Sequence, residues 1–123
     1  LPNEYISPQL NFEFHYFYMR KLWFLYHAKA LVVFPGGFGT MDELFETLTL
    51  IQTQKIEKFN IPVLLYDRLF WEDLINFPKL IEYKFIEPDD VHLFHYFSTP
   101  DEGLKYLKPK LKHSIKNYKQ LLR

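Results

Sequence analysis

"LVVFPGGFGTMDE", residues 31–43, joins an apolar run to an acidic segment through a turn rich in glycine. The apolar run at 30–34 is β-branched and aromatic, which is typical of a parallel strand that is buried on both faces. Apolar side chains then recur at helical spacing from Thr40 to Lys55, at Met41, Leu44, Phe45, Leu48 and Ile51. The stretch therefore predicts a buried strand, a tight turn and an amphipathic helix with these five side chains on one stripe.

The same alternation of strand and helix continues on both sides of this stretch. Further strands are predicted at 12–18, 61–67 and 91–97, and helices at 19–30, 69–77, 80–85 and from 99 onward. Pro78 should stop or kink the second of these helices. Thr99 and Glu102 are placed to form a capping box at the start of the last one. Strands that alternate with helices predict an α/β fold with a parallel sheet and right-handed crossovers.

The composition indicates one small globular domain. The chain has 123 residues, of which 48% are hydrophobic, and no linker or repeat divides residues 1–123. It contains no cysteine, which excludes disulfides and thiol catalysis, and we predict a cytoplasmic location. No apolar stretch approaches the roughly 20 residues that span a bilayer, so no membrane partner is predicted.

Charge is divided unevenly along the chain. Residues 1–103 carry eight Lys or Arg and fifteen Asp or Glu, whereas residues 104–123 carry seven basic residues and no acidic one. Leu107, Leu111 and Ile115 recur near helical spacing within this basic segment, which predicts an amphipathic helix docked on the domain from about residue 104. The alternative is a membrane or nucleic-acid patch. A nucleic-acid partner is not expected, because aromatic residues are sparse in this segment.

Three of the four glycines in the chain, Gly36, Gly37 and Gly39, lie between the predicted strand and helix. Such a turn cradles phosphate, because glycines let backbone N–H groups approach the oxygens and the helix dipole favours negative charge. The third glycine of a dinucleotide signature would fall at Asp42, which favours a mononucleotide bound by the N–H groups of residues 37–41. The alternative is a tight turn that needs glycines for positive φ angles.

Thr40 and Glu43 have the spacing of a second capping box, in which Glu43 would bond the Thr40 backbone N–H. This role competes with a chemical role for the carboxylate. Thr40 at the N-cap remains compatible with a hydroxyl that binds phosphate. The spacing alone leaves both interpretations open.

"MRK", 19–21, followed by "PGGFGTMDE", 35–43, resembles the signature of the Lonely Guy (LOG) family of nucleoside 5'-monophosphate phosphoribohydrolases, long labelled possible lysine decarboxylases. The family pattern is an Arg-Lys pair and then Pro-Gly-Gly-x-Gly-Thr-x-x-Glu, and the chain has every fixed residue. The resemblance covers about residues 10–103, and within the family the chain also resembles the longer bacterial branch. It implies a Rossmann-like fold, a homodimer and hydrolysis of AMP or a cytokinin riboside monophosphate to free base and ribose 5-phosphate.

The resemblance also assigns roles by motif position. Arg20 and Glu43 would form the catalytic pair. Substrate would be bound by Met19, Lys21, Gly36, Gly37, Gly39 and Thr40. Glu46, one helical turn beyond Glu43, is a further candidate for the same pocket, the alternative being a solvated position. No cofactor and no metal is predicted, since His15, His92 and His95 lack the spacing of metal ligands.

Elementary chemistry supports the pairing of Arg20 with Glu43. Cleavage of an N-glycosidic bond builds positive charge on the ribose, which a carboxylate stabilises while it orients or deprotonates water. A neighbouring Arg keeps that carboxylate ionised and binds sugar or phosphate oxygens. The alternative is a non-catalytic nucleotide-binding or sensing module. Such a module needs no carboxylate beside its anionic ligand, so the presence of Glu43 favours a hydrolase. Lysine decarboxylation would need a pyridoxal phosphate lysine, and no lysine context supports one.

The front of the chain departs from the family pattern. LOG members begin with a Gly-Ser-containing strand end, which this sequence lacks. We therefore expect the chain to be the C-terminal part of the domain without its first strands. Activity is expected of the parent protein, and the alternative for this chain alone is a stable fragment without activity.

Overall fold

The computed structural model describes residues 4–5, 25, 27–53 and 61–121. Its elements, in chain order, are β1 (Leu31–Val33), α2 (Phe38–Thr53), β2 (Val63–Tyr66), α3 (Arg68–Leu74), α4 (Phe77–Glu82), the 3-10 helix η2 (Pro88–His92), β3 (His95–Phe97) and α5 (Pro100–Leu121). The strand predicted at 12–18 and most of the helix predicted at 19–30 lie outside the described residues.

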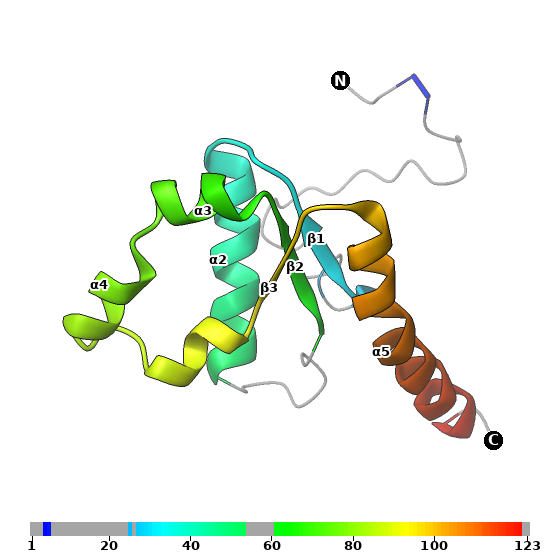
Figure 1. The fold of residues 1–123 in the computed structure, drawn as a ribbon. Helices are drawn as coiled ribbons and strands as arrows, with labels where there is room; N and C mark the ends of the chain where they lie inside the picture. The colour runs from blue at the N-terminus through cyan, green and yellow to red at the C-terminus, as the bar shows by residue number, and fades with distance from the viewer. Residues whose placement is uncertain (1–3, 6–24, 26, 54–60, 122–123) are drawn as a thin grey trace.

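The described strands form one parallel sheet in the order β1-β2-β3. Figure 1 shows α2 on one side of this sheet and α5 on the other. The prediction of an α/β fold with a parallel sheet is confirmed, and the arrangement is Rossmann-like. Because all three strands run in the same direction, the turns that follow them meet at one edge of the sheet.

The core lies between the sheet and α2. Val33 pairs with Leu65 in register, and both side chains are buried together with Leu44 and Ile51 from α2. Burying each such side chain contributes about 1.5 to 3 kcal/mol, so this layer fixes how α2 lies against the strands. Phe45, predicted on the same stripe, is 40% exposed, because it lies about 100° around the helix from the buried Leu44.

The opposite face of the sheet receives the first turns of α5. The Phe97 ring packs so closely on Gly103 that a Cβ there would lie 3.2 Å from it, and the rings of His95 and Tyr106 stack with centroids 4.2 Å apart. Thr99 accepts a hydrogen bond from the Glu102 N–H, as the predicted capping box requires. The Glu102 carboxylate, however, accepts from the Ser98 N–H and not from that of Thr99. The five described lysine side chains of α5 are exposed: Lys105, Lys108, Lys110, Lys112 and Lys116.

Two predicted boundaries were wrong for local reasons. Pro78 lies in the first turn of α4 instead of ending a helix, because Asn76 caps that helix by accepting a hydrogen bond from the Lys79 N–H. The strand predicted at 91–97 is reduced to His95–Phe97. Pro88 and the reciprocal bonds between Glu87 and Asp90 fold the preceding residues into η2 instead.

Trp71 anchors α3 beneath the end of β2. Its side chain is fully buried, and its indole Nε1 donates a 2.8 Å hydrogen bond to the carbonyl of Tyr66. Between them, Asp67 adopts φ 70°, and its carboxylate accepts from the Phe70 N–H. This arrangement satisfies a buried indole N–H while the chain turns from strand to helix.

None of the described helices is long and apolar enough to cross a membrane. The cytoplasmic location stays a prediction.

Candidate active site

The glycine turn leads into α2 earlier than the sequence predicted. The Met41 N–H donates to the Gly37 carbonyl at 3.0 Å, so Gly37 occupies the N-cap position and the helix begins at Phe38. The N–H groups from Gly37 to Thr40 precede that of Met41, the first to donate within the helix, and so have no partner within the helix. These amides are the candidate phosphate donors, whereas the Met41 amide, included in the prediction, is used by the helix itself.

The glycines of the turn are there for reasons other than backbone conformation. None of the four glycines of the chain, all of them described, has a positive φ, so the alternative of a positive-φ turn is wrong. A Cβ on Gly36 would overlap the Thr40 side chain, lying 2.9 Å from its Cβ. Apart from the neighbouring residues and the backbone of the helix itself, no described atom lies within 4 Å of a Cβ built on Gly37 or Gly39. Gly36 is required by packing, while Gly37 and Gly39 leave open space at the start of the helix.

Thr40 is the third residue of α2 and packs its half-buried side chain over Gly36. A capping box with Glu43 requires Thr40 at the N-cap, so that interpretation is wrong. Because the helix begins at Phe38, its first turn contains no acidic residue, and Asp42 and Glu43 lie beyond that turn. Glu43 therefore does not act as the capping residue, and the interpretation that competed with a chemical role no longer holds.

Three carboxylates converge just beyond this turn. Oxygens of Asp42, Glu43 and Glu46 lie within 4.8 Å of one another. Glu43 and Glu46 are half-buried, and the Glu46 Oε2 atom is shielded from solvent. A cluster of this kind stabilises positive charge that develops beside it. Its oxygens also suit a hard cation such as Mg²⁺, although the sequence predicted no metal.

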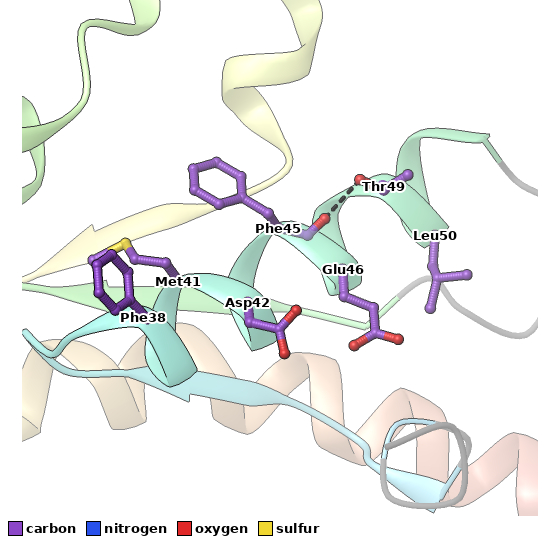
Figure 2. A pocket seen from close by; sticks show the side chains of 7 residues that line it. All are labelled: Phe38, Met41, Asp42, Phe45, Glu46, Thr49 and Leu50. Carbon is purple, nitrogen blue, oxygen red and sulfur yellow. Dashed lines mark hydrogen bonds between the residues drawn. The ribbon is translucent and has the colours of Figure 1, made fainter. Parts of the chain in front are cut away.

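Asp42 was not among the site residues predicted from the sequence. Its signal was the four-residue spacing to Glu46, which places both side chains on one face of a helix. Figure 2 shows the two carboxylates on the same side of α2. The structure therefore adds Asp42 to the predicted candidates Glu43 and Glu46.

An open groove runs along one side of α2 (Figure 2). It is lined by Phe38, Met41, Asp42, Phe45, Glu46, Thr49 and Leu50. Its lining combines an apolar stripe with two of the three carboxylates. Glu43 is outside this lining but keeps its carboxylate within 4.8 Å of those of Asp42 and Glu46.

The remaining predicted site residues, Met19, Arg20 and Lys21, lie outside the described residues. The pairing of Arg20 with Glu43 stays a prediction. Among the described histidines, His95 stacks on Tyr106, and neither it nor His92 belongs to the group of ligand-type side chains around Glu43.

Comparison with known proteins identifies the family. A family model described as "possible lysine decarboxylase" matches residues 1–107. Two plant proteins are each 32% identical to the chain over 93 residues. They are the probable cytokinin riboside 5'-monophosphate phosphoribohydrolase LOGL6 of Oryza sativa subsp. japonica and the cytokinin riboside 5'-monophosphate phosphoribohydrolase LOG1 of Arabidopsis thaliana. The chain belongs to the LOG family.

The alignment to these LOG relatives covers 74% of this chain, but only 36% of the rice protein and 42% of the Arabidopsis protein. The chain therefore matches less than half of each curated LOG relative. The family follows from the match to its model, which includes the glycine turn and the carboxylate cluster.

Proposed function

We propose that the protein hydrolyses the N-glycosidic bond of a nucleoside 5'-monophosphate, either AMP or a cytokinin riboside monophosphate. The products are the free base and ribose 5-phosphate. The observation that carries this proposal is the position of the Asp42, Glu43 and Glu46 carboxylates directly beyond the glycine turn of α2. The names of the two LOG relatives support the same reaction.

The glycine turn binds the substrate, and the carboxylate cluster stabilises the charge that develops during the reaction. The N–H groups from Gly37 to Thr40 hold the 5'-phosphate at the positive end of α2. The C1′–N bond then breaks with its electron pair on the base, which takes up a proton, and positive charge develops on the ribose. The nearby carboxylates stabilise that charge.

Water completes the reaction by attacking C1′. We assign Glu43 as the group that orients this water and accepts its proton, with Arg20 keeping the carboxylate ionised. Simple nucleotide binding would gain nothing from three carboxylates beside an anionic ligand. Their convergence therefore favours a hydrolase over a sensing module.

The direct test is to incubate the full-length protein with AMP and to follow adenine and ribose 5-phosphate by chromatography. Both products should appear in equal amounts. Binding of AMP without release of adenine would contradict the proposal and favour the sensing module. The 123-residue chain is assayed in parallel, and we expect activity of the full-length protein only.

Gly39→Ala is expected to stabilise the fold but to weaken AMP binding about tenfold. Gly39 lies inside α2, where alanine is favoured by up to about 1 kcal/mol, and a Cβ there meets no described atom within 4 Å. The added methyl group instead takes space that a phosphate needs beside the amides. Thermal melting and titration calorimetry with AMP measure both effects.

Gly36→Ala is the matched control for this pair of measurements. Its Cβ would overlap the Thr40 side chain, so the melting temperature should fall. Unchanged AMP affinity in Gly39→Ala, in a variant that melts no lower than wild type, would argue against phosphate binding at this turn.

We also propose that the full-length protein is a homodimer, as the LOG resemblance implies. The aromatic-rich segments at 12–18 and 23–26 offer apolar surface for such an interface, and apart from Leu25 they lie outside the described residues. Static light scattering should give twice the chain mass. A monomer at high protein concentration would contradict this proposal.

A further inference from the structure

Phe38 is the most exposed large apolar side chain of the described residues, at 96%. It is the first residue of α2 and lies between Gly37 and Gly39, where the backbone is most open. Single exposed apolar residues are common on protein surfaces. This one differs because it lies within the candidate phosphate-binding turn and also lines the groove on α2.

The groove continues the apolar surface that begins at Phe38. Met41 and Phe45 follow it along the same face of the helix, and Figure 2 shows all three side chains along the lining. With a rise of about 1.5 Å per residue, the stretch from Phe38 to Phe45 is about 10 Å long. An apolar strip of this length, open to solvent, accommodates a flat aromatic group lying beside the turn.

Charge decides which part of a nucleotide lies in the groove. Asp42 and Glu46 belong to its lining, and their carboxylates would repel a phosphate. The phosphate is therefore confined to the amides from Gly37 to Thr40. A neutral base carries no such penalty and finds apolar surface in the groove.

We propose that Phe38 stacks on the nucleobase of the bound nucleoside monophosphate and so determines that the substrate carries a base. This inference rests on the proposed function, because it takes the 5'-phosphate of the ligand to be bound at the amides from Gly37 to Thr40. Every base offers a π-face, so stacking on Phe38 supplies affinity for a base without selecting among bases. The phosphate site is separate from it and recognises ribose 5-phosphate equally well.

The test compares the full-length wild type with Phe38→Ala and Phe38→Tyr, using AMP and ribose 5-phosphate as probes in titration calorimetry. Phe38→Ala should weaken AMP binding about tenfold and leave ribose 5-phosphate within about twofold of wild type. Phe38→Tyr should restore AMP affinity, because it keeps the stacking ring. Leu69→Ala is the matched control, since Leu69 is 79% exposed on α3, outside the groove lining.

Three outcomes would overturn the inference. AMP affinity of Phe38→Ala could equal that of wild type, both probes could weaken equally, or light scattering could show that the variant loses its dimer. The second would make Phe38 a support of the turn and the third a subunit contact. If the wild type binds AMP through Phe38 but releases no adenine, the inference stands while the proposed hydrolase function fails.

Discussion

Glu43→Gln should lower kcat for AMP hydrolysis by about a hundredfold or more while AMP affinity stays nearly unchanged. The substitution keeps the size of the side chain but removes the charge that stabilises the ribosyl cation and accepts the proton of water. Glu43 lies outside the phosphate-binding amides, so ground-state binding has little to lose. Steady-state kinetics and calorimetry on the full-length protein separate the two quantities.

Glu72→Gln is the control for this experiment. Glu72 is a glutamate exposed on α3 and paired with Arg68, outside the carboxylate cluster of α2. Its substitution should leave kcat within about twofold, since exposed ion pairs contribute little. A Glu43→Gln enzyme that folds and turns over AMP within about threefold of wild type would refute the catalytic assignment.

Trp71→Ala should lower the free energy of unfolding by about 3 to 5 kcal/mol. The side chain is fully buried in the core, and its removal leaves a cavity beneath β2. The Tyr66 carbonyl would also lose the indole N–H that now donates to it. Folded domains are stable by only about 5 to 15 kcal/mol, so this single change removes a large fraction of the total. Urea denaturation measures the loss.

Trp71→Phe separates packing from hydrogen bonding in the same experiment. The smaller ring keeps most of the apolar contact but cannot donate to Tyr66, and we expect a loss of about 1 to 2 kcal/mol. A Trp71→Ala variant destabilised by less than about 1 kcal/mol would show that α3 is not held by this side chain.

The sequence predicted the parts of the fold that depend on burial. Val33 of the β-branched run and Leu44 and Ile51 of the periodic stripe are all buried. The expectation that this strand is buried on both faces was wrong, because Val32 is 41% exposed. Boundaries set by single hydrogen bonds were harder to predict. Glycine is only modestly enriched at helix N-caps, where threonine is common, so the start of α2 was predicted at Thr40 and not at Gly37.

The candidate site was predicted in part for a related reason. Motif and spacing identified the glycines, Glu43 and Glu46, which follow one another from the turn into a single helix. The groove depends on which apolar residues are left outside the core, and periodicity assigned Phe45 to the inner stripe although it is 40% exposed. Asp42 was missed although its four-residue spacing to Glu46 places both side chains on one face of a helix.

The contact between Gly36 and Thr40 affects how fast a ligand can be captured. Thr40 packs over Gly36, and the Gly37 carbonyl already accepts the Met41 N–H, so the amides point outward before any anion arrives. The conformational entropy of ordering this turn is lost when the protein folds and not when the ligand binds. Association with phosphate is therefore expected to be limited by diffusion and charge, without a slow loop-closing step.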